Sequence, residues 1–121
     1  MNKSNLSEEL IMKIPELKPL YDKELDDWEE FPGNHNVFGN VLNPFLVELL
    51  EKKNQERLKK RIFQFFEDMA LSEDDDVQNV LIVTVLEYLG DSEKCLKEAR
   101  KLMGNRTLEF SKEVEKWLGR S

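Results

Sequence analysis

Histidine and cysteine, two side chains that commonly act as general base and nucleophile, are scarce in this sequence and lie far apart. The chain has one histidine, His35, and one cysteine, Cys95. His35 lies in the segment FPGNHNVFGN, which contains no cysteine or serine that a histidine could activate. Cys95 falls on the apolar side of an amphipathic pattern, where a thiol packs without reacting. We therefore expect no catalytic residue, and we interpret His35 as a turn residue and Cys95 as a packing residue.

The sequence does not indicate a metal or cofactor site either. One cysteine and one histidine cannot form an internal disulfide or an ordinary zinc site. The acidic run at residues 73–76 lacks the alternating acids, the glycine and the final glutamate of a calcium loop, and it suits a helix N-terminus. We expect no metal and no cofactor.

A basic cluster in the middle of the chain is a candidate phosphate or RNA surface. Its members are Lys52, Lys53, Arg57, Lys59, Lys60 and Arg61. Glutamates are interspersed with them, and neither a glycine-rich phosphate loop nor an exposed aromatic platform accompanies them. We interpret the cluster as a solvated helix face and expect no direct binding of nucleic acid.

Another charged segment sets a tryptophan among acidic side chains, immediately before a stretch rich in asparagine and glycine. Its members are Asp22, Glu24, Asp26, Asp27, Trp28, Glu29 and Glu30. An aromatic side chain surrounded by acids resembles an interface hot spot, so we predict that these residues bind a protein partner. The other interpretation is that Trp28 fastens its helix to the core, as most large aromatic side chains do.

Composition limits the class of protein. The chain has 121 residues, of which 40% are hydrophobic and 36% charged, and its net charge is −7. This length suits one domain with one core. The negative charge disfavours a duplex nucleic-acid binder and favours basic partners. The N-terminal stretch has acids inside its only apolar segment, so we expect no signal peptide and a cytoplasmic location.

The most apolar stretch is DVQNVLIVTVLEYLG, at residues 76–90. Its apolar residues leave no continuous polar face, so we expect a central helix that other helices cover on several sides. It is too short to span a bilayer. Its β-branched residues would also suit a buried strand, but the flanks favour a helix, with a capping run at residues 72–76 and Gly90 as a left-handed C-terminal residue.

Amphipathic patterns predict the other elements. We expect a short helix capped by Ser7, a helix from Pro19 to the acidic segment, and an irregular stretch over residues 31–40. Helices then follow at residues 43–53, 55–70, 92–103 and 107–118, in the first of which Asn43 is the cap and Pro44 the first residue. In the last helix Thr107 is the cap, and Phe110, Val114, Trp117 and Leu118 are expected to face the core.

These elements predict a single all-α domain over residues 1–121, with about six helices in antiparallel pairs around the central helix. Residues 1–40 form N-terminal helices and a loop, and residues 41–119 form the helical core. Each of the two dipeptides Leu50-Glu51 and Leu86-Glu87 ends a helix before a polar turn and another helix. The helix pairs are therefore either a stack of α-hairpins or a repeat of the helical-repeat type.

The order FFEDMALSEDDDVQNVLIVTVLEYLGD, preceded by NPFLVELLEKKNQERLKKRIF, resembles small all-helical bacterial proteins of largely uncharacterised families. Some of these look like immunity proteins of polymorphic or contact-dependent toxin systems. The resemblance covers residues 41–118, includes no catalytic signature, and carries over no functional residue. It implies a cytoplasmic protein that binds and neutralises a cognate toxin.

The predicted function is therefore a non-catalytic protein-binding module, in the form of an immunity protein whose partner is a basic toxin domain. The alternative is a small regulatory or adaptor protein that binds another protein. Neither a membrane nor nucleic acid is an expected partner. The sequence leaves the oligomeric state open.

Overall fold

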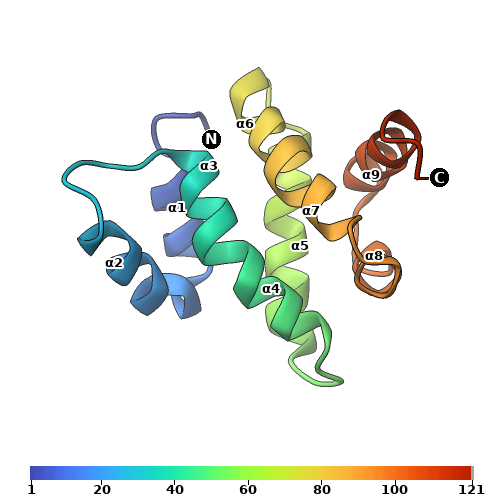
Figure 1. Cartoon of the computed structure of the whole chain (residues 1–121), viewed down its shortest axis with the longest axis horizontal. Coiled ribbons are helices and arrows are strands. Elements are labelled where there is room, and N and C mark those ends of the chain that lie inside the picture. Colours follow the sequence, from blue (N-terminus) through green and yellow to red (C-terminus); the bar gives the residue numbers. More distant parts are fainter. Residues whose placement is uncertain (121) are drawn as a thin grey trace.

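The computed structural model describes residues 1–120, and every regular element in this part of the chain is helical (Figure 1). In chain order they are α1 (Leu6–Lys13), the 3-10 turn η1 (Pro15–Leu17), α2 (Lys18–Asp26), α3 (Asn34–Val37), η2 (Phe38–Leu42), α4 (Asn43–Leu50), α5 (Glu56–Ala70), α6 (Asp75–Asn79), η3 (Val80–Leu86), α7 (Glu87–Leu89), α8 (Glu93–Arg100) and α9 (Asn105–Trp117). The predicted all-α fold is confirmed. Within these residues, no helix is both long enough and apolar enough to cross a membrane.

Two of the helices are longer than their labels suggest, because π-helical segments join neighbouring elements. α3, η2 and α4 run on as one helix over residues 34–50, and the joining residues Val37 and Leu42 have right-handed helical φ and ψ. α6, η3 and α7 likewise form one helix over residues 75–89. The two π-helical segments contact each other. The central stretch is therefore a helix, as predicted, and not a strand.

The prediction of an irregular stretch over residues 31–40 is wrong for its second half. Helix begins at Asn34, directly after Gly33, whose φ of 103° turns the chain into it. Asn43 consequently lies inside a continuous helix and does not cap one. Asparagine and glycine are poor helix formers, but Val37 and Phe38 are fully buried in the core, and this burial outweighs the weak local preference.

The hydrophobic core draws on both ends of the chain. Leu10 near the N-terminus and Val114 near the C-terminus are buried, as is Phe66 in the middle of the chain. The predicted stripe of α5 is confirmed, and its members Leu58, Ile62, Phe65, Phe66 and Met69 are all buried. The helix of residues 75–89 is covered on most of its surface, but Val83 and Tyr88 are 43% and 45% exposed.

The predicted cap from the acidic run is confirmed, Ser92 supplies a further cap, and the predictions for Ser7 and Gly90 are wrong. Ser7 lies inside α1, which begins after Asn5, and its hydroxyl donates to Asn34 Oδ1 at 2.7 Å. The Asp74 carboxylate accepts from the backbone N–H of Asp76, and the Ser92 hydroxyl accepts from that of Cys95. Gly90 has a φ of −74°, so it is not left-handed as predicted. Glycine suits this position for another reason: a Cβ there would collide with the carboxylate of Glu115.

The cap of α9 comes from a different helix than the sequence suggests. Thr107 does not cap α9; instead the carboxylate of Glu67 on α5 accepts from the backbone N–H of Arg106 at 3.1 Å and of Thr107 at 2.9 Å. The Thr107 hydroxyl donates to the same carboxylate at 2.8 Å. A side chain at Gly104 would collide with Glu67, so this glycine permits the close approach of α5 and α9.

The predicted inward face of α9 is confirmed at Phe110 and Val114, which are buried. At the end of the helix the prediction is wrong. Trp117 is 76% exposed and Leu118 is 44% exposed. The buried residue of the last turn is Glu115, because its carboxylate accepts from Nε and Nη2 of Arg120 at 3.0 and 2.7 Å. The inner side of this last turn is therefore lined by the ion pair, and the end of the helix leaves Trp117 and Leu118 exposed.

We expect Val80→Asp to lower the free energy of unfolding by about 3–5 kcal/mol, because it places an unpaired charge in the core. Val83→Asp, three residues away on the exposed side of the same helix, should cost less than about 1 kcal/mol. Urea denaturation followed by circular dichroism measures both. Equal effects of the two variants would mean that the central helix is buried on a different face.

Glu67 should make stability depend on pH. Burial raises the pKa of Glu67, but hydrogen bonds from Thr107 and Arg106 outweigh this effect and place its pKa below the ordinary value of 4.5. The stabilisation is therefore fully present above that ordinary value and disappears as pH falls through the lower folded-state pKa. Thermal melts of wild type and Glu67→Gln should differ most at about pH 6, above the ordinary value, and converge as pH falls below 4.5 and through the lower folded-state pKa. Glu113→Gln, an exposed change of the same charge on α9, should show no such convergence.

Candidate protein-binding surfaces

The predicted acidic segment lies on α2 and the turn that follows it, at one end of the long axis of the molecule (Figure 1). Trp28 is 47% exposed, so it does not fasten α2 to the core. Its indole Nε1 donates to Glu24 Oε2 at 3.1 Å, and Asn40 Nδ2 donates to the same oxygen at 2.8 Å. The shared carboxylate connects the exposed ring to the helix of residues 34–50 and holds it in one orientation.

The other members of the acidic segment have different surroundings. Asp27, Trp28, Glu29 and Glu30 line one open hollow. Asp26 is exposed, and Asp22 is turned towards Lys18 on its own helix, at 2.8 Å. Phe31, three residues after Trp28, is 52% exposed. The structure thus places a second exposed aromatic side chain, which the sequence prediction missed, next to the predicted segment.

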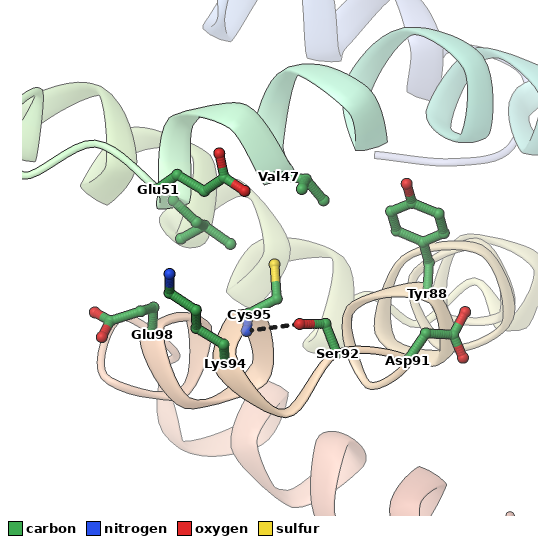
Figure 2. Close-up of a pocket in the computed structure, with 9 residues that line it drawn as sticks. Val47, Glu51, Tyr88, Asp91, Ser92, Lys94, Cys95 and Glu98 are labelled. Carbon is green, nitrogen blue, oxygen red and sulfur yellow. Dashed lines mark hydrogen bonds between the residues drawn. The ribbon is translucent and has the colours of Figure 1, made fainter.

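A separate cavity of about 230 Å³ lies between α4, the end of α7 and α8 (Figure 2). In Figure 1, α8 lies on the side of the molecule away from α2. Its lining residues are Val47, Leu50, Glu51, Tyr88, Asp91, Ser92, Lys94, Cys95 and Glu98. Figure 2 shows the Cys95 thiol pointing from α8 towards α4, with Val47 above it and the Tyr88 ring to one side. Sequence reasoning missed this cavity because its walls come from segments that are distant in the chain.

Chemically, the cavity is suited to packing and not to nucleophilic attack. Burial raises the pKa of the Cys95 thiol, and the nearby negative charge of Glu51 raises this pKa further. The hydroxyl of Ser92 is occupied in capping α8. Two carboxylates at the rim are paired within the protein, Asp91 with Arg120 at 2.6 Å and Glu98 with Lys101 at 3.1 Å.

The other candidate residues take structural positions. His35 lies in α3 and not in a turn, and its Nδ1 is 2.6 Å from the hydroxyl of Thr84 on η3. Lys59 is 6% exposed and not solvated, because its ammonium donates to the Lys52 carbonyl. Asp74 accepts from the backbone N–H of Lys3 and of Asp76, and these hydrogen bonds lower its pKa. Among residues 1–120, no cluster of three histidine, cysteine or acidic side chains could hold a metal ion.

Comparison with known families adds one assignment. Residues 7–118 match the family described as Domain of unknown function (DUF7674). The chain belongs to this family. No curated protein and no solved structure matches the chain.

The DUF7674 match extends from α1 to the end of α9, so the acidic segment and the cavity both lie inside the DUF7674 domain. The domain therefore includes most of the N-terminal residues that lie outside the resemblance to immunity proteins. The family description names no activity or partner. The resemblance to immunity proteins remains a prediction.

Cys95 should behave as a thiol that ionises with difficulty. We expect its alkylation by iodoacetamide to accelerate only above the ordinary thiol pKa of 9.0, since burial and Glu51 both disfavour the thiolate. Glu51→Gln should move the midpoint of the rate profile down slightly, and Glu48→Gln, one turn earlier on α4 and beside a different hollow, should leave it unchanged. Rapid alkylation of the folded protein at neutral pH would show instead an activated thiol.

Proposed function

We propose that this DUF7674 domain is a non-catalytic protein-binding module, and that its acidic segment around Trp28 contacts a basic partner. The observation that carries this proposal is the half-exposed Trp28 ring, held by Glu24 and Asn40 in the middle of a run of carboxylates. Tryptophan is among the residue types that most often dominate binding energy at protein interfaces.

Preorganisation supports this role for Trp28. An exposed side chain that must be immobilised on binding loses conformational entropy, and this loss weakens the complex. Trp28 is already restrained by its hydrogen bond to Glu24, which is in turn restrained by Asn40. A partner that covers the ring would therefore gain apolar contact at a small entropic cost.

Charge supports the choice of partner. The net charge is −7, and exposed carboxylates at Asp26, Asp27, Glu29 and Glu30 surround the ring. Such a surface attracts positively charged proteins and accelerates their association. Toxins that cut nucleic acid are commonly basic where they grip phosphate. The specific form of the proposal is therefore an immunity protein that neutralises a basic toxin domain, and the alternative is a regulatory or adaptor protein with a different basic partner.

The experiment is co-expression with the product of the adjacent gene, followed by purification of any complex and a growth assay. A complex together with rescue of growth supports immunity. A complex without any effect on growth supports the adaptor alternative and contradicts immunity. The absence of both would contradict the immunity form of the proposal.

Within such a complex, Trp28→Ala should raise the dissociation rate about tenfold or more, because the buried anchor is lost. Asp26→Lys with Asp27→Lys should mainly lower the association rate, and raised salt should do the same because it screens long-range attraction. Surface plasmon resonance at several salt concentrations measures each rate.

Matched controls separate the acidic segment from net charge and from general apolar exposure. Glu48→Lys with Glu113→Lys changes the net charge by the same amount at exposed positions elsewhere, and Met12→Ala removes a side chain that is 78% exposed on α1. Neither control should change the rates by much. A complex that responds equally to the test and control variants would place the interface elsewhere.

A further inference from the structure

The C-terminal end of α9 carries an aromatic side chain that the described residues leave largely exposed. Trp117 is 76% exposed, compared with 47% for Trp28. The next residue, Leu118, lines an open hollow together with Val83 and Tyr88, each of which is also more than two-fifths exposed. Such a concentration of exposed apolar side chains is characteristic of an interaction surface.

This apolar surface is continuous with the cavity between α4, α7 and α8. Tyr88 and Asp91 line both the cavity and the hollow beside Leu118. Leu118, the chain neighbour of Trp117, therefore lies at the edge of the surface that contains the cavity. The exposed indole projects beside this edge, where a twofold axis can bring the indole of each copy to the cavity of the other. A twofold dimer requires this kind of self-complementary patch.

The cavity suits an indole in size and in lining. Its volume is about 230 Å³, and Val47, Leu50 and the Tyr88 ring supply apolar walls. Aromatic side chains favour such walls, and aromatic pairs gain about 0.5–1.5 kcal/mol beyond the area that they bury.

The charges around the two features are also complementary. The cavity rim has three carboxylates, Glu51, Asp91 and Glu98, and one ammonium group, Lys94. Asp91 and Glu98 already accept from Arg120 and Lys101, so Glu51 is the carboxylate best placed to meet an incoming cation. On α9, Lys116 immediately precedes Trp117, and both side chains are exposed.

We propose that a second copy of this chain covers the cavity, with Trp117 of each copy inserted between α4, α7 and α8 of the other and Lys116 placed against Glu51. Val83, Tyr88 and Leu118 extend the contact around each inserted indole. A specific dimer generally buries about 1,200–2,000 Å² in total, so the contact must include these neighbours as well as the ring. The interface is distinct from the acidic segment, and this proposal is independent of the proposed function.

The first experiment is sedimentation equilibrium of the full chain over a range of concentrations. A concentration-dependent dimer is expected, and Trp117→Ala should raise its dissociation constant about tenfold or more. Trp28→Ala is the matched control, since it removes the other tryptophan at the opposite end of the molecule, and it should leave the dissociation constant unchanged. A monomer at all concentrations up to about 1 mM would overturn the proposal, because that concentration corresponds to only weak affinity. A dimer that survives Trp117→Ala, or that dissociates on Trp28→Ala, would also overturn it.

The second experiment tests the charge pair by reversal. Glu51→Lys and Lys116→Glu should each weaken the dimer, and the double variant should restore it, because the pair is re-formed with opposite polarity. Glu48→Lys makes the same change in net charge one turn earlier on α4, at an exposed residue that does not line the cavity, and should have little effect. If Glu48→Lys weakens the dimer as much as Glu51→Lys, or if the double variant is no better than the single ones, the proposed contact is wrong.

A third readout uses the cavity itself. Cys95 lines the cavity, so its alkylation by iodoacetamide should be slower above the dimer dissociation constant than below it. Trp117→Ala should remove this difference while leaving the circular dichroism spectrum unchanged. Protection that is independent of concentration in the wild type would contradict insertion of the indole from a second copy.

Discussion

The packing of one long helix on another, over residues 34–50 and 75–89, is the constraint on which the rest of this structure depends. The two π-helical segments meet there, and Asn43, only 2% exposed, donates from Nδ2 to the backbone carbonyl of Thr84 at 2.9 Å. π-Helical turns are rare and leave backbone groups displaced from the regular helical ladder. A buried amide that binds one such carbonyl fixes both the register and the distance of the pair. The other polar atom of this amide, Asn43 Oδ1, is buried without a hydrogen-bond partner in the described chain, and this lowers the stability of the fold.

The helix of residues 34–50 also connects the two candidate binding surfaces, which are the acidic segment around Trp28 and the cavity beside Cys95. Near its beginning, Asn40 holds the Glu24 carboxylate and through it the Trp28 ring. At its other end, Val47, Leu50 and Glu51 form one wall of the cavity. Because this helix is anchored to the central one through Asn43, the wall of the cavity and the Asn40 amide that holds Glu24 both lie on a packed helix. Trp28 itself lies in the turn after α2, so its position depends on this contact with the helix. Sites supported by packed helices hold their side chains more precisely than sites on loops.

The fold class could be predicted because apolar periodicity is local. The stripe of α5 is readable from spacing alone, and all its members are buried. The start of the helix at Asn34 could not be predicted in this way, since asparagine and glycine have the local signature of a loop and only burial of Val37 and Phe38 by distant residues reverses it. The cap of α9 is a further example: the local candidate, Thr107, donates to Glu67, which lies forty residues earlier in the chain.

The candidate sites show the same contrast between features that local sequence reveals and features that only the fold assembles. The acidic segment was visible in sequence because its residues are consecutive, and the structure then decided the exposure of Trp28. The cavity was not visible, because its lining is assembled from α4, α7 and α8. Trp117 was misplaced because its spacing from Val114 continues an apolar stripe, whereas the Glu115 and Arg120 pair occupies the inner side of that last turn. Spacing predicts which side chains share a helix face, but it does not show how far along the helix its neighbours continue to cover that face.

The positions of the two tryptophans also determine whether the two proposed contacts are compatible. Trp28 follows α2 at one end of the long axis, and Trp117 ends α9 at the other (Figure 1). A dimer formed through the cavity and α9 would therefore leave both acidic segments uncovered and carry them on its outer ends. Such a dimer would present two binding surfaces to a basic partner that is itself multivalent, and the second contact would form at a high effective concentration. Self-association would then strengthen partner binding without adding a single new contact at Trp28.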